Sequence, residues 1–525
     1  MSRNDFLIRT EILTGEFHVT IKNNKYKHMK TIRFIPVIIA GVMALTLSSC
    51  KKDFLDVNVD PNNPVKATVD LVLPTGQGYA AYNLGNPYQV LAGYWGQVWT
   101  QGPTGSQFLN YDQYSITSTN FDRQWINMYA GPLNDFKYIV DEATKNGNTN
   151  YAAIGKIMQA YLFQVMTDLH GDIPFSEALQ AGTGLINPKF DSQEQVYDGL
   201  ITLVNEGLAL IDENSTLHPG ADDFFYHGDM HQWIRFANTL KLKIYLRQAY
   251  IRPAVAQAGI QAMYAAGAEF IDQGDEAAVP FSNTVFNQHP LFAHINSVGQ
   301  FNILASQTSI GALQFLNDPR IDVFYQRATA APNTGNHVGI VQGMGRLLPN
   351  PATLNDRQFS KPGIAVGGPG GAAARVIFMS EAESYFLQSE AVLRGWGTGD
   401  AESLYYDGIA LSFLSWGLSI AQFNSYAAQT AVDYPVAGTL EQKLRAVIFQ
   451  KWTSMCGSQN VEAWTEWRRT GYPDIFTISA STNIGNKFPV RLLYPDSEIT
   501  SNPNTPAQKT ITDKLWWDAN TTGQN

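Results

Sequence analysis

The sequence predicts an α-helical protein, in which a scaffold of paired helices carries long irregular loops and little β-structure. Apolar residues recur at the spacing of one helix face in five stretches, residues 151–169, 196–211, 233–249, 382–393 and 440–452. Strand-like alternation of apolar and polar residues is scarce. Helices of about 20 residues that follow one another in pairs are typical of tetratricopeptide-like hairpins, although no clean repeat of about 34 residues is present.

The N-terminal part has the pattern of a secretory signal. Lys30 and Arg33 precede an almost uncharged apolar run over residues 34–47, and the sequence LSSC then ends at Cys50. The run is too short for a membrane span, which needs roughly 20 apolar residues. Small residues directly before a cysteine are typical of a bacterial lipobox. Residues 29–49 are therefore predicted to be a lipoprotein signal peptide with lipidation at Cys50. The alternative is an ordinary signal peptide followed by a chance cysteine.

The residues on either side of this signal have separate interpretations. Met29 opens a complete signal by itself, so residues 1–28 are interpreted as an extension that comes from a start codon assigned too early. Residues 50–64 are polar and end in turn-forming residues, which predicts a lipid-anchored tether. One acyl chain binds a membrane only marginally, so stable anchoring at Cys50 needs more than one chain.

The remainder, residues 65–525, is expected to be a single helical domain. Asp191 and Ser192 directly precede the stretch over residues 196–211, as helix N-termini prefer, and Gly395 ends the stretch over residues 382–393. Two long segments interrupt the helical pattern. They lie at about residues 275–375 and 470–515 and are rich in Gly, Pro and Asn. Irregular segments of this length are usually functional or pinned to a scaffold, so both are expected to be loop-rich insertions.

Charge and cysteine content exclude several classes of protein. The chain has 36 Lys and Arg against 46 Asp and Glu, a formal net charge of −10. An acidic surface argues against a nucleic-acid partner and against binding of anionic lipid, so membrane contact is expected through the lipid anchor only. There are two cysteines. With Cys50 lipidated no intrachain disulfide can form, and Cys456 is expected to be a buried thiol.

Two motifs look like metal or phosphate sites, but a structural role is the favoured interpretation of each. Asp168-Leu169-His170-Gly171-Asp172 lacks the third histidine or the HExxH pair that would complete a zinc site, and is interpreted as a helix-ending turn with capping carboxylates. The glycine-rich residues 367–371 lack the GK[ST] of a P-loop and are interpreted as a flexible loop. No catalytic residue, metal ligand or cofactor is therefore assigned.

Two acidic groups and one tryptophan-rich run also have two interpretations each. Paired carboxylates can act as the acid and base of a glycosidase. The candidates are Glu381, Glu383 and Glu390 in one group and Glu462 and Glu466 in the other. Because Arg or Lys lies close to both groups on predicted helices, ion pairs within the scaffold are favoured. The run Trp464 to Arg469 can bind an anion through cation–π and guanidinium contacts, but closing a core is its favoured role.

Several segments, in a fixed order along the chain, carry a resemblance to a known family. They are HGDIPFSEA at residues 170–178, WIRFANTLKL at 233–242, ESYFLQSEA at 383–391, QKW at 450–452, EAWTEWRRTGYP at 462–473 and RLLYP at 491–495. Each segment alone is weakly specific, whereas the ordered set after a lipobox is strong. The chain resembles the SusD/RagB outer-membrane lipoproteins, in the SusD-like branch.

The resemblance implies a tetratricopeptide-like body that is lipid-anchored in the outer membrane and faces the cell exterior. It also implies a partner, a SusC-like TonB-dependent barrel on which such a protein sits as a lid. Members of this family capture nutrient oligomers for import. We therefore expect a non-enzymatic protein that captures oligosaccharides. The alternatives are a peptide-binding RagB-like protein, a surface glycoside hydrolase, and a structural subunit that only closes the transporter.

A segment that mixes aromatic with amide and hydroxyl side chains is the candidate ligand site. Sugars present flat C–H faces ringed by hydroxyls, so their sites need aromatic platforms and polar partners. The candidate rings are Trp95, Trp99, Tyr111 and Tyr114. The other interpretation is that these rings pack the first helix pair. In related proteins mid-chain loops also contribute, and here that adds Asn283 and Asn287.

Overall fold

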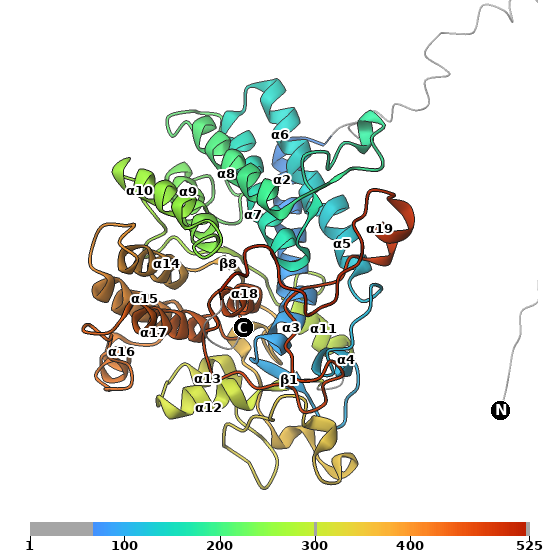
Figure 1. Ribbon diagram of the computed structural model, residues 1–525, viewed down its shortest axis with the longest axis vertical. Coiled ribbons are helices and arrows are strands. Elements are labelled where there is room, and N and C mark those ends of the chain that lie inside the picture. Colours follow the sequence, from blue (N-terminus) through green and yellow to red (C-terminus); the bar gives the residue numbers. More distant parts are fainter. Residues whose placement is uncertain (1–66, 299–301, 521–525) are drawn as a thin grey trace, which may run out of the picture. The chain divides into compact units, whose positions relative to one another are not determined.

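Helices form most of the structure (Figure 1). The computed structural model describes residues 67–298 and 302–520. The predicted extension, signal peptide and tether, with Cys50, lie outside the described residues, so those boundaries stay predictions. These described residues form one compact unit. Among the described residues, no helix is both long and apolar enough to cross a membrane.

All five predicted helical stretches are helices. They are α7 (Thr149–His170), α8 (Gln193–Leu210), α9 (Met230–Arg247), α14 (Glu381–Leu393) and α17 (Leu440–Ser454). Ser192 begins α8 with a capping box, in which its side chain accepts from the Gln195 N–H, and Thr439 begins α17 in the same way. Gly395 follows α14 at a φ of 74°, a left-handed conformation that favours glycine. The predicted helix ends are therefore the observed ones to within a few residues.

Further helices join these five in two groups of neighbours. The first group contains α7, α8 and α9 together with α2 (Val69–Gly85), α3 (Pro87–Trp95), α5 (Asp122–Met128), α6 (Asn134–Asn146) and α10 (Pro253–Ala265). The second group contains α14 and α17 together with α15 (Ala401–Ser415), α16 (Ile420–Ala427) and α18 (Asn460–Thr470). Within the groups α7 packs along α6 and α8, and α14 packs along α15 and α17. Successive helices thus pack side by side, and the predicted fold class, a tetratricopeptide-like helical scaffold, is confirmed.

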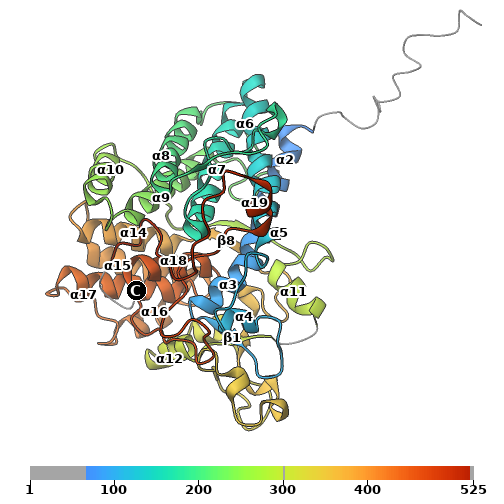
Figure 2. The same ribbon diagram turned by 45° about the vertical axis from the view of Figure 1, so that its right-hand side comes forward.

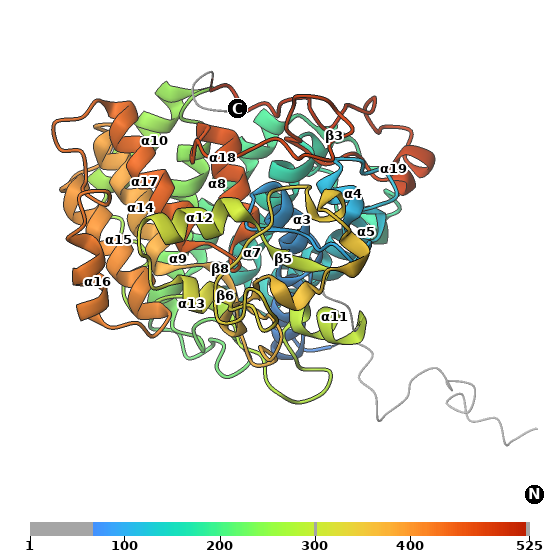
Figure 3. The same ribbon diagram turned by 90° about the horizontal axis from the view of Figure 1, so that it is seen from below.

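Short helices belong to the irregular segments. They are α4 (Leu109–Asp112), α11 (Pro290–Val298), α12 (Gln307–Phe315), α13 (Ile321–Phe324) and α19 (Asp496–Ser501). Figures 1, 2 and 3 place α14 to α17 on one side of this unit and α4 and α11 on the opposite side. Helix α12 lies between these two sides and approaches the α17 side, as Figure 3 shows.

In the part of the chain that the structure describes, the strands are short and form four two-stranded antiparallel sheets. The pairs are β1 (Trp99–Gln101) with β5 (Ile303–Ala305), β2 (Ile173–Pro174) with β3 (Phe190–Asp191), β4 (Ala277–Val279) with β8 (Val376–Met379), and β6 (Tyr325–Gln326) with β7 (Lys361–Pro362). In β1 and β5, Trp99 lies opposite Ala305, and in β4 and β8, Ala277 lies opposite Met379. The strands therefore tie the loop-rich residues 275–375 to the helical body.

The cysteine prediction that the described residues can test is confirmed. Cys456 is a free cysteine with no exposed surface. Burial raises the pKa of its thiol, because the thiolate would have to form in an apolar environment. It lies in the largest cluster of buried apolar residues, which also contains Trp452 and Trp464. Cys456 therefore acts as a small core residue.

Candidate ligand-binding site

Three of the four predicted sugar-stacking rings are core residues. Trp95, Trp99 and Tyr114 expose 2%, 0% and 2% of their surface. The Trp95 indole N–H donates to the Tyr111 carbonyl at 3.1 Å, and its ring packs edge-on against Trp464. A ring enclosed in this way has no face open to a sugar. The expectation that Trp95, Trp99 and Tyr114 contact ligand is therefore corrected, and the packing interpretation holds for them.

The amide side chains of the same segment bind the backbone of distant loops. Gln97 Nε2 donates to the Thr477 carbonyl at 2.5 Å, and Gln97 Oε1 accepts from the Thr477 N–H and from the Thr308 hydroxyl. Gln101 Oε1 accepts from the Phe108 N–H at 2.9 Å. These amides satisfy main-chain groups of irregular segments that no helix or sheet would satisfy. The mixture of rings and amides is thus a core beneath loops.

Asp112 is a buried carboxyl group that hydrogen-bonds to three residues of this core. Its carboxylate accepts hydrogen bonds from the Thr100 hydroxyl, the Gln101 N–H and Gln342 Nε2, each at 2.9 Å. Burial without a neighbouring cation raises the pKa of Asp112 to about 7, although the three hydrogen bonds act in the opposite direction. The carboxyl group therefore links β1 to the loop that contains Gln342.

Tyr111 remains accessible at the edge of this core. Its ring is half-buried and stacks on Phe108 with 5.2 Å between centroids. Phe108 in turn contacts the ring of His294 at 5.7 Å, and the exposed Gln107 side chain lies within 3.1 Å of His294 Nε2. His294 belongs to α11, so α11 covers the side of the core on which Tyr111 lies.

The second predicted region, around Asn283 and Asn287, is an exposed loop. Both residues are exposed, and the Ser282 N–H donates to the Asn287 carbonyl at 2.8 Å, which closes the loop on itself. At its tip Phe286 is fully exposed and has a φ of 71°. A left-handed backbone is unfavourable for a bulky residue, so this conformation holds the ring outward at a cost. The loop leads directly into α11 at Pro290.

The Asp168–Asp172 motif closes a helix end, as predicted. Helix α7 ends at His170, and Gly171 follows with a φ of 89°. Asp172 accepts from the first N–H of α8, that of Gln193, at 2.8 Å, whereas Asp168 pairs with Arg247 at 3.3 Å. The His170 ring is buried, which lowers its pKa to about 3. Among the residues that the structure describes, no group of three or more His, Cys, Asp or Glu side chains is placed to hold a metal ion.

The carboxylates that were glycosidase candidates form a buried ion network, with one exception. Glu462 pairs with Arg247 at 2.7 Å and with Lys451 at 3.1 Å, and Glu466 pairs with Lys451 at 3.2 Å. Glu383 pairs with Lys243 at 3.2 Å. Glu381 instead accepts from the Gly274 N–H at 2.5 Å.

Arg469 joins two more carboxylates into the same network. It pairs with Glu390 and with Glu466, each at 2.6 Å, and its neighbour Arg468 lies over the Trp464 ring at 3.7 Å. The network connects α7, α9, α14, α17 and α18. The predicted structural role of residues 464–469 is therefore confirmed, because these side chains are fully buried and pair with scaffold groups.

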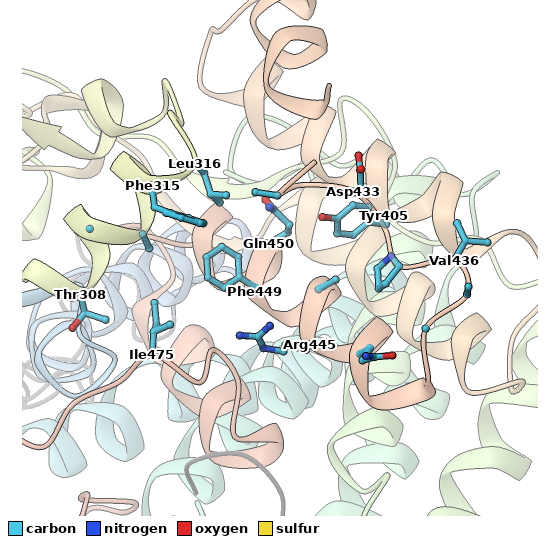
Figure 4. Close-up of a pocket in the computed structure, with 18 residues that line it drawn as sticks. Thr308, Phe315, Leu316, Tyr405, Asp433, Val436, Arg445, Phe449, Gln450 and Ile475 are labelled. Atoms are coloured by element: carbon cyan, nitrogen blue, oxygen red, sulfur yellow. The ribbon is translucent and has the colours of Figure 1, made fainter. Parts of the chain in front are cut away.

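An open groove lies between α12 and α17, where the sequence predicts no site (Figure 4). It encloses about 980 Å³. One face of each helix lines it, with Thr308, Ala312 and Phe315 on α12 and Gln442, Arg445 and Phe449 on α17. Figure 4 shows the Phe315 ring reaching toward Phe449 across the groove. The loop over residues 431–438 closes one end. An apolar hollow with a few polar groups is the usual form of a small-molecule site.

Solved structures of SusD homologs share this fold. A chitin-binding protein superposes with a TM-score of 0.74 at 24% identity, over 86% of this chain and 100% of that one. A chitin-binding SusD homolog from Flavobacterium johnsoniae gives a TM-score of 0.72 at 24% identity, over 86% and 99%. A SusD homolog from Bacteroides uniformis gives 0.72 at 22% identity, over 85% and 99%. The fold is thus that of SusD homologs.

The sequence itself identifies the family. Residues 61–495 match the SusD-like family described as "Starch-binding associating with outer membrane". This match covers most of the chain, and the chain belongs to the SusD-like family, as the resemblance implied. A comparison with curated proteins gave no match.

Proposed function

We propose that this protein captures oligosaccharides outside the cell and delivers them to a SusC-like TonB-dependent barrel in the outer membrane. The observation that carries the proposal is the match of residues 61–495 to a family described as starch-binding and associating with the outer membrane. The LSSC sequence at Cys50 supports a lipid anchor. Two similar structures are described as chitin-binding, so oligomers of glucose and of N-acetylglucosamine are the first ligands to test.

The proposed ligand surface is the loop over residues 281–288 together with the accessible edge of Tyr111. Phe286 offers an open aromatic face, and the exposed Asn283 and Asn287 offer amides for sugar hydroxyls. Helix α11 connects the two parts, because it begins directly after the loop and its His294 packs on Phe108 beside Tyr111. Aromatic and amide groups on one surface suit a neutral sugar.

Capture without hydrolysis is the favoured form of this function. A glycosidase needs two carboxyl groups that reach the scissile bond, about 5–10 Å apart. Glu383 and Glu466 are buried, Glu462 exposes 13% of its side chain, and each of the three is paired with Lys or Arg, which favours a structural role over acid and base catalysis. Chromatography of an oligosaccharide after incubation with the purified protein tests this point. Release of shorter oligomers would favour the hydrolase alternative.

The binding experiment uses a soluble form that begins at residue 51, without the lipidated Cys50, and maltohexaose, N-acetylchitohexaose and a mixed peptide digest as probes. We expect a sugar to bind in calorimetry, and Phe286→Ala to weaken it about tenfold, since loss of one stacked ring is worth about 1.4 kcal/mol. Ile186→Ala is the matched control, because Ile186 is also an exposed apolar loop residue, at 74%. Heat from the peptides alone would favour the RagB-like alternative. Heat from no probe would favour a structural subunit.

A further inference from the structure

The groove between α12 and α17 has the composition of a binding site, and it is separate from the loop over residues 281–288. We infer that this groove is a second site for neutral oligosaccharides, an inference that rests on the proposed function. Phe315 is 76% exposed, although it lies on a helix face that would normally pack against a neighbour. Thr308, Ala312 and Phe315 recur at the spacing of one helix face, and all three line the groove.

The two aromatic rings provide the apolar part of the site. Phe315 stands on the α12 wall and Phe449, which is half-buried, on the α17 wall (Figure 4). Each ring offers a face against which the C–H face of a sugar packs, as aromatic side chains do in ligand pockets. A sugar between the two walls would cover apolar surface that water now contacts, and this favours binding.

The charges in the groove favour a neutral ligand over an anionic one. Arg445 reaches the groove, but its guanidinium is bound by Asp474, with Arg445 Nε 3.0 Å from both carboxylate oxygens. That pair neutralises the positive charge. The other charged residue that lines the groove is Asp433, which is exposed and negative. A uronic acid or a sulfated sugar would meet an unfavourable field there, whereas sugar hydroxyls can donate to the carboxylate.

A second hollow extends the site with amide side chains. It encloses about 520 Å³, and its lining residue Asn317 directly follows Leu316, which lines the groove. Asn317 Nδ2 donates to Gln429 Oε1 at 3.2 Å in the lining of this second hollow. Gln422, Ser425 and Gln429 line the second hollow. Amides and hydroxyls that both donate and accept match the hydroxyls of a sugar chain. Two hollows lined by neighbouring residues of the chain suit an oligomer rather than a monosaccharide.

The walls also argue against an extended peptide. Peptides that bind as an added strand need an exposed sheet edge with free N–H and C=O groups. The two long walls of the groove are helices, whose backbone groups bond within the helix. Recognition along those walls must therefore come from side chains. This arrangement fits a sugar chain, which is bound by rings and side-chain polar groups.

The test places a reporter in the groove. In Phe315→Trp the new indole should change its fluorescence when maltohexaose or N-acetylchitohexaose binds, and the hexamer should bind more tightly than the disaccharide. In Phe315→Ala, calorimetry should show one of two binding events lost, or its affinity reduced about tenfold. Ile186→Ala is again the control, because its exposure of 74% is close to that of Phe315. Melting temperatures show that each variant is folded.

The outcomes separate this inference from the proposed function. If the wild type binds a hexamer, Phe286→Ala weakens it, and neither Phe315 variant responds, the groove is not a sugar site although the proposed function stands. If the wild type binds neither sugar, both ideas fail together. A response of Phe315→Trp to the peptide digest, with none to either sugar, would assign the groove to peptides and overturn the inference.

Discussion

Arg469 offers the most direct test of how the helices are held together. Its guanidinium donates to Glu466 through Nε at 2.8 Å and Nη2 at 2.6 Å, and to Glu390 through Nη1 at 2.7 Å and Nη2 at 2.6 Å. The side chain of Arg469 has no exposed surface, and those of Glu390 and Glu466 expose 1% and 3%. One arginine thus makes four charge-assisted hydrogen bonds and links α18 to α14.

Arg469→Met removes the charge and keeps a side chain of similar length. Loss of one partner from a buried ion pair costs about 3–5 kcal/mol, because the other partner stays buried without its counter-charge. Arg394 still pairs with Glu390 at 2.8 Å, and Lys451 with Glu466 at 3.2 Å. We therefore expect a loss of about 3 kcal/mol in the free energy of unfolding at pH 7, at the lower end of that range.

The effect should depend on pH, with a definite sign. In the wild type the neighbouring cations hold the pKa of Glu390 and of Glu466 below the usual value. Their contribution to stability is therefore present above the unfolded-state pKa of about 4.3 and is lost as the pH falls through the lower folded values. In Arg469→Met, Arg394 still pairs with Glu390, but loss of the Arg469 charge should leave the pKa of Glu390 less strongly lowered, so that the variant loses less stability than the wild type as the pH falls below about 4.3. The difference between the two proteins should therefore be larger at pH 7 than at pH 3.

Equilibrium urea unfolding, followed by tryptophan fluorescence at both pH values, measures this difference. Arg327→Met is the control, because Arg327 and its partner Asp322 expose 51% and 53% of their side chains. An exposed pair of this kind contributes about 0–1 kcal/mol. A loss below about 1 kcal/mol for Arg469→Met at pH 7 would show that the network does not hold the helices together. An equal loss at pH 3 and pH 7 would show that the carboxylates are not responsible.

Two further predictions concern the core beneath the loops. Trp99→Ala should lower the free energy of unfolding by about 3–5 kcal/mol, because the ring is fully buried, and should leave the affinity for any bound sugar unchanged. Urea unfolding and calorimetry measure the two quantities. Weaker sugar binding at unchanged stability would assign Trp99 to the ligand site. Asp112→Asn should flatten the pH dependence of stability. The raised pKa of Asp112, about 7, gives the wild type stability that is full below about pH 4 and is lost as the pH rises to about 7, on the order of 4 kcal/mol. Parallel unfolding curves for the two proteins between pH 4 and pH 8 would contradict this assignment.

The helices were predictable because their signals are local. The apolar stripe over residues 151–169 and the cap at Ser192 lie within the elements they define, and α7 and α8 begin and end close to them. The ion pairs of Glu462 and Glu466 were predictable for the same reason, since Arg and Lys lie nearby on helices. The short strands were not. β1 pairs with β5 across some 200 residues of chain, and three residues of Trp-Thr-Gln carry no sign of that partner.

The ligand site was harder to predict, because the same residue composition occurs in sugar-binding sites and in cores beneath loops. Trp95 and Trp99 beside glutamines match a sugar site, but the same residues build a core beneath irregular segments, where Gln97 bonds to the Thr477 backbone. Only the distant loop decides between the two, and its position does not follow from local sequence. For Phe315 the sequence pattern and the structure differ in the opposite direction. This residue continues the apolar stripe of α12, which predicts burial, yet 76% of its surface is exposed.

The strand pair β4 and β8 brings the two ends of a long chain segment together. Because Val279 lies opposite Val376, residues 280–375 leave the helical body and return to it at nearly the same point. A segment whose two ends meet can be exchanged for another of different length without moving the helices that flank it. An exchange here has to keep β5 and Gln342, because β5 pairs with β1 and Gln342 donates to the buried Asp112. The exposed parts of the segment, such as the loop over residues 281–288, are free of that constraint and can change in length.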